Sequence, residues 1–64
     1  MRLVNLIAAR EARKMPQHQA ATIVGVSQSH YSKIERGELA FDARQALALC
    51  RAFEMSLEKL LVSD

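Results

Sequence analysis

Hydrophobic residues recur at intervals of three and four positions along most of this chain, which is the period of an α-helix with one buried face. No strand-like alternation of polar and apolar residues is sustained anywhere, so the sequence predicts an all-α fold. The predicted helical segments are residues 2–13, 17–24, 28–36 and 43–53, with a last turn or two after Ser56.

Residues that begin or end helices separate these segments. Pro16 is expected at the first position of the second helix, where its fixed φ and missing N–H cost nothing. Gly25 can end that helix with a left-handed φ, and Ser27 is a good N-cap for the third helix. The other signals are Gly37 as a helix stop and Asp42 and Ser56 as N-caps.

The fourth segment has an apolar stripe at helical spacing that predicts its core side. Leu49 lies off this stripe. The stripe consists of Ala43, Ala46, Leu47, Cys50 and Phe53.

Gln17–Val24 and Gln28–Arg36 are joined by three residues only, the layout of a helix-turn-helix motif whose second helix enters the DNA major groove. If Tyr31 and Ile34 face the core, Glu35 falls near the core edge. Gln28 and His30 fall at the flanks, and the outward face consists of Ser29, Ser32, Lys33 and Arg36. This face is polar and basic without a carboxylate. It could be an ordinary solvated helix face, but at this spacing in the motif it favours contact with phosphates and base edges.

Length and charge limit the class of protein. The 64 residues are expected to form one domain, residues 1–64, and the net charge is +2. Residues 1–37 contain six basic and two acidic residues, whereas residues 38–64 contain three and five. A basic half that contains the motif suits a polyanionic partner. The lone Cys50 cannot form a disulfide within the chain, and no segment could span a bilayer, so a cytoplasmic location is expected.

Catalytic and metal sites are not expected. His18, His30 and Cys50 are too scattered for a zinc-binding pattern, and Cys50 is read as a small buried hydrophobe. The sequence has no glycine-rich phosphate loop, no Ser/His/Asp set and no paired carboxylates in a plausible cleft. We therefore expect neither an enzyme nor a bound cofactor or metal.

Several short motifs occur in a characteristic order. They are Arg10-x-x-Arg13, Gln17-x-x-Ala20-Ala21, Gly25-Val26-Ser27-Gln28-Ser29, Ser32-Lys33-Ile34-Glu35-Arg36-Gly37 and Ser56-Leu57-x-x-Leu60-Leu61. Through them the chain resembles the lambda-repressor/Cro-type (XRE-like) helix-turn-helix proteins, from about Leu3 to Leu61. The resemblance implies five helices, with the third as the recognition helix.

The resemblance also implies roles for individual residues. An ion pair between Arg10 and Glu35 would tie the first helix to the third, and a carboxylate near the core edge independently needs such a cation. Gln17 and Arg36 match phosphate-contact positions, and His30 either contacts phosphate or lies at the rim. The positions that reach base edges are Gln28, Ser29, Ser32 and Lys33.

The sequence departs from the family pattern at Pro16, which replaces the usual Ser or Thr cap of the second helix. It also departs at Tyr31, whose hydroxyl needs a partner or a route to solvent. The remaining departures are Ala20 and Phe41.

These features predict a sequence-specific, repressor-type transcriptional regulator that binds operator DNA in a bacterial or phage cytoplasm, associated with the nucleoid. A homodimer is expected, because a single motif buries too little DNA for tight specific binding. The dimer surface is expected around Leu49, Phe53 and Val62. No small-molecule ligand is expected. The alternative is an antitoxin or another protein-interaction module with the same fold. A purely protein partner is disfavoured by the basic residues Lys33 and Arg36 and by the positive charge of residues 1–37.

Overall fold

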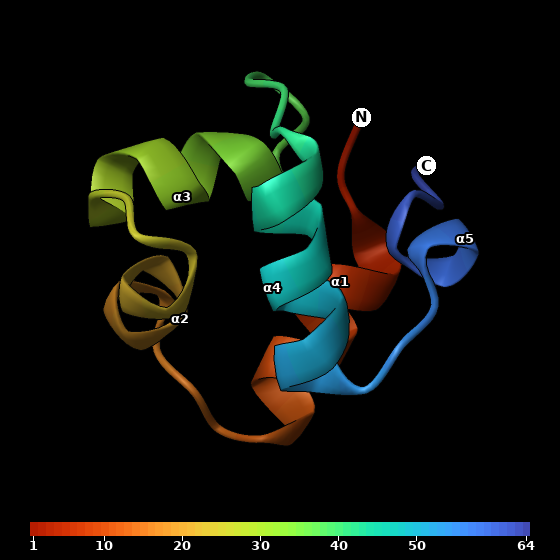
Figure 1. Cartoon of the computed structure of the whole chain (residues 1–64), viewed down its shortest axis with the longest axis horizontal. Helices are drawn as coiled ribbons and strands as arrows, with labels where there is room; N and C mark the ends of the chain where they lie inside the picture. Colours follow the sequence, from red (N-terminus) through yellow and green to blue (C-terminus); the bar gives the residue numbers. More distant parts are fainter.

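The computed structural model describes all 64 residues and contains five α-helices and no strands (Figure 1), which confirms the predicted all-α, five-helix fold. The helices are α1 (Val4–Ala12), α2 (Gln17–Val24), α3 (Gln28–Glu35), α4 (Ala43–Phe53) and α5 (Leu57–Leu60). The chain ends lie side by side, because the Arg2 N–H donates to Asp64 Oδ1 at 2.9 Å and the Asp64 N–H donates to the Arg2 carbonyl at 3.2 Å.

Most of the residues predicted to begin or end helices do so in the structure. Gly25 has φ +82° after α2, and the Ser27 hydroxyl accepts the His30 N–H at the start of α3. Asp42 forms a reciprocal capping box with Gln45 at the start of α4. Ser56 caps α5 by accepting the Lys59 N–H.

Pro16 occupies the N-cap position of α2 and not the first helical position that we predicted. Its ψ of 158° is extended, so the helix begins one residue later, at Gln17. Proline has no side-chain acceptor, and α2 accordingly has no side-chain cap.

The core is built from small and large apolar residues of all five helices. Leu6, Tyr31, Ile34, Leu49 and Leu60 are its largest fully buried side chains. On α2 the buried residues are alanines, Ala20 and Ala21, which lets the backbone of α2 approach its neighbours closely. The core thereby fixes α2 against α3 and α4.

The register of α4 differs from the predicted one. Leu49 is fully buried and Leu47 is 50% exposed, so the core face runs through Ala46, Leu49 and Phe53. These three positions share one helical face at i, i+3 and i+7. The sequence has more apolar residues around α4 than the core can cover, and the excess lies outside.

The predicted dimer surface is therefore wrong in two of its three residues. Leu49 and Phe53 pack inside the domain, where they cannot meet a second chain, and the Arg13 guanidinium lies 5.4 Å from the centroid of the Phe53 ring. Val62 is exposed, as that prediction required.

The longest of the five helices, α4, has 11 residues, and none has the length and apolar character needed to cross a bilayer.

Candidate nucleic-acid interface

A short, well-defined turn sets α2 and α3 at an angle to each other at one side of the molecule (Figure 1). The N–H groups of Gly25 and Val26 both donate to the Ala21 carbonyl, at 2.8 and 3.0 Å. Gly25 supplies the left-handed φ, which a residue with a side chain rarely adopts. Ser27 then caps α3 through its hydroxyl. The turn is thus fixed by backbone bonds at the end of α2 and by a side-chain cap at the start of α3.

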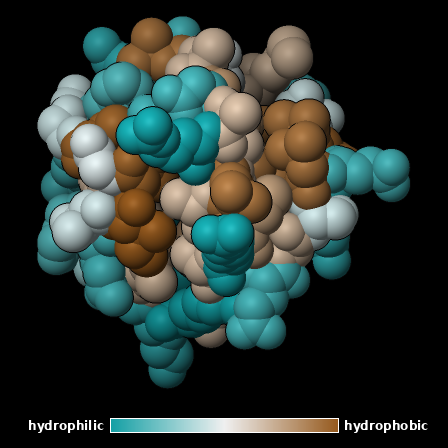
Figure 2. Space-filling model, in the orientation of Figure 1, coloured by the Kyte–Doolittle hydropathy of each residue, from teal (hydrophilic) through white to brown (hydrophobic).

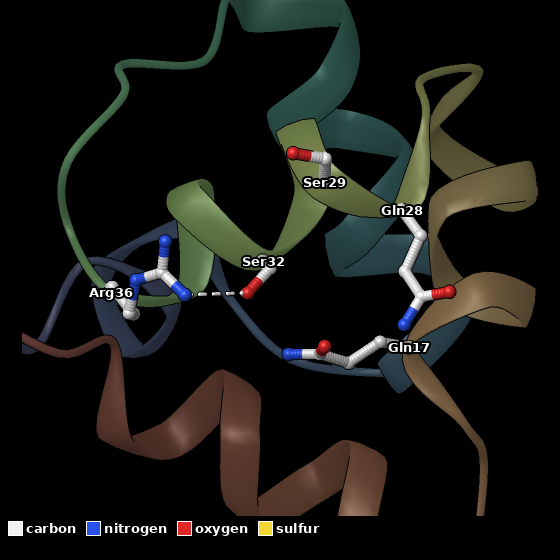
Figure 3. A pocket seen from close by; sticks show the side chains of 5 residues that line it. All are labelled: Gln17, Gln28, Ser29, Ser32 and Arg36. Atoms are coloured by element: carbon white, nitrogen blue, oxygen red, sulfur yellow. Dashed lines mark hydrogen bonds between the residues drawn. The ribbon is translucent and has the colours of Figure 1, made fainter.

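An open groove of about 390 Å³ lies between the start of α2 and the outer face of α3 (Figure 3). None of the five side chains that line it is hydrophobic; they are Gln17, Gln28, Ser29, Ser32 and Arg36. The Gln28 side chain points toward Gln17, and Arg36 reaches back along α3 toward Ser32 (Figure 3). Amides, hydroxyls and a guanidinium can donate hydrogen bonds to phosphate and exchange them with base edges.

The groove brings together five of the seven residues predicted to contact DNA. The other two lie outside its lining: Lys33 is exposed on α3, and His30 is half-buried. Tyr31 and Ile34 are fully buried on the opposite side of α3, which matches the predicted orientation of the helix. Whether these side chains contact DNA remains a prediction.

The predicted ion pair between Arg10 and Glu35 is present in the structure. Arg10 Nε donates to Glu35 Oε2 at 2.6 Å and Nη2 donates to Oε1 at 3.2 Å, so the contact is two-pointed. The side chains of Arg10 and Glu35 are only 12% and 4% exposed. Arg10 Nη1 also donates to the Met15 carbonyl at 2.8 Å, which ties the α1–α2 connection to the same guanidinium.

Glu35 also holds Gln17, a contact that we did not predict. Gln17 Nε2 donates to Glu35 Oε1 at 3.0 Å. One buried carboxylate therefore orients an arginine of α1 and a groove-lining amide of α2 from its place on α3. The sequence signal for this contact was the polar residue at the start of α2, which we assigned to phosphate contact and not to Glu35.

Burial alone would raise the pKa of Glu35, but the hydrogen bonds from Arg10 and Gln17 outweigh it and the pKa is lowered. Glu35 is thus ionised at neutral pH. Burial, followed by the nearby Glu35 carboxylate, raises the pKa of Tyr31. The Tyr31 hydroxyl is fully buried and has no hydrogen-bond partner with acceptable geometry, so the structure contains neither the partner nor the route to solvent that we expected.

A second unpredicted cluster lies at the end of α3. Arg36 Nε donates to Glu38 Oε2 at 2.9 Å, and Arg36 Nη1 donates to Ser32 Oγ at 2.9 Å. We predicted no contact for Glu38 from the sequence. The available signal was Gly37, because a glycine helix stop turns the following residue back toward the helix.

Comparisons with known proteins agree with this architecture. The family model described as helix-turn-helix matches residues 6–60. Over 52 residues the chain is 38% identical to an uncharacterised HTH-type transcriptional regulator of Sinorhizobium fredii. That match covers 81% of this chain and 26% of the relative, so the chain spans about a quarter of the relative's length. No solved structure matches significantly.

The match covers most of the chain, and α2 and α3 form the motif. The chain belongs to the helix-turn-helix family, which confirms the predicted resemblance to the lambda-repressor/Cro-type proteins.

Proposed function

We propose that this chain is the DNA-binding part of a transcriptional regulator and binds double-stranded DNA sequence-specifically by inserting α3 into the major groove. The observation that carries the proposal is the groove of Gln17, Gln28, Ser29, Ser32 and Arg36, which is polar throughout and open to solvent. The regulator named above supports the role in transcription. We place repression first, because occupancy of an operator is enough to obstruct transcription.

Four residues of α3 are proposed to read base edges: Gln28, Ser29, Ser32 and Lys33. Lysine pairs with the O6 and N7 acceptors of guanine, and glutamine pairs with adenine, so Lys33 and Gln28 carry most of the sequence preference. Gln17, His30 and Arg36 are proposed to contact phosphate. Glu35 fixes the amide of Gln17, so this contact is made by a side chain already oriented before DNA binds.

Substitutions on α3 should separate these two roles. Lys33→Ala should cost roughly 1–3 kcal/mol on the preferred site and relax base preference at one position. Arg36→Ala should weaken binding to all sequences alike and reduce the slope of log K against log salt by about 1. Gel shifts on preferred and scrambled duplexes across a salt series measure both effects. The proposed orientation of α3 is wrong if Lys33→Ala leaves both the affinity and the sequence preference unchanged.

We further propose that the chain binds as a homodimer, through a surface different from the one predicted from sequence. An apolar hollow of about 240 Å³ lies between α4 and α5, lined by Ala43, Ala46, Leu47, Cys50 and Leu57. Leu47 and Leu57 are about half exposed, and hydrophobic side chains gather over α4 and α5 in Figure 2. A second copy would cover them, and binding to two half-sites would require the two α3 helices to lie about 34 Å apart, one turn of B-DNA.

Sedimentation equilibrium tests this proposal. The wild-type chain should sediment at twice the mass of one chain, and Leu47→Glu should return it to a single mass with an unchanged circular dichroism spectrum. Leu39→Glu, at another exposed leucine in the α3–α4 loop, is the matched control and should leave the dimer intact. A wild-type chain that stays at single mass both free and on DNA would contradict the homodimer and leave the hollow to a different protein partner.

A further inference from the structure

The end of α3 places Glu38 beside Arg36 through backbone geometry. The Gly37 N–H donates to the Ile34 carbonyl at 3.0 Å, and the Glu38 N–H donates to the Lys33 carbonyl at 2.9 Å. With Gly37 at φ +75°, these bonds form a Schellman motif, which folds the chain back over the last helical turn. A side chain at Gly37 would also collide with the Met1 carbonyl oxygen, 1.9 Å from an added Cβ. The position of Glu38 is therefore set by the fold.

Glu38 occupies the edge of Arg36 that best matches an oxyanion. Its two carboxylate oxygens accept from Arg36 Nε at 2.9 Å and Nη2 at 3.4 Å. This is the fork that arginine presents to carboxylates and phosphates. Arg36 Nη1 is engaged with Ser32 Oγ at 2.9 Å. Three of the five guanidinium N–H groups are thus already used within the protein, and the Nε–Nη2 edge has no room for a phosphate.

The pair is accessible to DNA. The side chains of Arg36 and Glu38 are 49% and 54% exposed, and Arg36 lines the groove. The Glu38 carboxylate pairs with the positive charge of Arg36 and also lies near Lys33 and the amino terminus of the chain. These three cations lower the pKa of Glu38, and Arg36 has the largest effect. Glu38 is therefore ionised at neutral pH and lies where a phosphate oxygen is expected.

We propose that Glu38 is an internal competitor for the DNA phosphate at Arg36, a carboxylate that holds the Nε–Nη2 edge in the free protein and must yield it before a phosphate can bind there. This proposal rests on the DNA-binding function proposed above. The competition weakens binding to every sequence by the same factor, because Arg36 reads no base. It therefore lowers overall affinity and leaves the base preference of α3 unchanged.

Glu38→Gln tests the proposal, because it removes the charge and keeps the size of the side chain. Binding to both preferred and scrambled duplexes should tighten by the same factor, roughly two- to fivefold, the range set by an exposed ion pair. The salt dependence of log K should steepen by a fraction of about 0.9, the value for one phosphate neutralised, because Arg36 makes part of that contact in the wild-type protein already. The ranking of duplex sequences should stay the same.

Two controls assign the effect to Arg36. Glu58→Gln makes the same charge change on α5, away from the groove, and should alter affinity less than Glu38→Gln. In an Arg36→Ala background, the gain in DNA affinity caused by Glu38→Gln should fall to the size of the gain caused by Glu58→Gln.

If Glu38→Gln raises DNA affinity equally with and without Arg36, the proposal is overturned, because Glu38 then only repels the DNA as a negative charge. If Glu38→Gln lowers the affinity, the proposal is also overturned, because Glu38 then holds Arg36 in its binding position. If the folded wild-type chain and all variants fail to bind any duplex, the proposed function itself fails. In the other two cases DNA binding stands.

Discussion

Replacing Arg10 with methionine should lower the free energy of unfolding by roughly 3–5 kcal/mol at neutral pH, the cost of removing one partner from a buried ion pair. Glu35 would remain in the core with only Gln17 to stabilise its charge. Natural domains have only about 5–15 kcal/mol of stability, and small ones lie at the low end, so the variant should be largely unfolded on warming. Urea and thermal unfolding followed by circular dichroism at 222 nm measure the loss.

The loss should depend on pH with a defined sign. In the wild-type protein the pKa of Glu35 is lowered, so its pairing stabilises the fold above the ordinary carboxyl pKa and is lost as pH falls through the lowered value. Without Arg10, burial should instead raise the pKa of Glu35. With a raised pKa, Glu35 is tolerated in the core only in its protonated form, so the free energy of unfolding of the variant falls as pH rises. The gap between variant and wild type should therefore be widest near neutrality and should narrow below about pH 4.

Arg51→Met is the matched control, because Arg51 is exposed on α4 and forms no ion pair. It should change stability by less than about 0.5 kcal/mol. Combining Arg10→Met with Glu35→Leu should recover much of the loss, since no charge then remains buried. Equal stabilities of Arg10→Met and Arg51→Met would show that the Arg10–Glu35 pair contributes nothing to the fold.

Truncating Leu49 should have the second largest effect on the fold. Leu49→Ala removes a fully buried side chain and leaves a cavity, which costs about 2–5 kcal/mol. Leu47→Ala, two residues earlier on the same helix and half exposed, should cost less than about 1 kcal/mol in the monomer. Chemical unfolding at low protein concentration compares the two without a contribution from dimerisation. A larger loss for Leu47→Ala than for Leu49→Ala would restore the register of α4 that the sequence pattern predicted.

Helix boundaries were predictable where one residue determines the local backbone conformation or caps a helix within the next three residues. Gly25 ends α2 because only its φ fits the turn, and Asp42 and Ser56 begin helices through their own side-chain oxygens. These signals extend over three or four residues and do not depend on tertiary packing. Pro16 was misplaced by one position, because the same ring suits both the cap and the first turn of a helix.

The register of α4 was not predictable in the same way. Ala43, Leu47 and Cys50 continue the apolar stripe around the helix, and sequence alone does not say which part of so wide a stripe faces α1, α2 and α5. The structure buries Leu49 and exposes Leu47. The error carried over to the predicted dimer surface at Leu49, whereas Phe53 was already part of the stripe predicted to face the core.

The candidate interface was predicted at the level of a helix face but not at the level of contacts. Helical periodicity puts Tyr31 and Ile34 inward and Ser29, Ser32 and Arg36 outward. The contacts between Gln17 and Glu35 and between Arg36 and Glu38 depend on how α2 and the loop after α3 are placed. Both show that carboxylates near the groove fix the polar side chains that are proposed to meet DNA.

The Arg10–Glu35–Gln17 network also explains how so small a domain can hold α3 in place. It joins α1, α2 and α3 through three side chains, and Arg10 adds the Met15 carbonyl in the connection between α1 and α2. A loss of Arg10 should therefore affect DNA binding through the angle between α2 and α3 as well as through stability. Of these three side chains only Gln17 lines the groove, so Arg10 and Glu35 act on it indirectly.

Selection of bound duplexes from a random-sequence pool tests most directly whether the outer face of α3 reads DNA. We expect the wild-type chain to enrich one short half-site, repeated in inverted orientation with centres about 10 base pairs apart, as two α3 helices on one face of B-DNA require. Lys33→Ala should lose the preference at one position of that half-site and keep the spacing. A folded wild-type chain that enriches no sequence, or a Lys33→Ala variant that selects the same half-site with equal preference, would contradict base readout by α3.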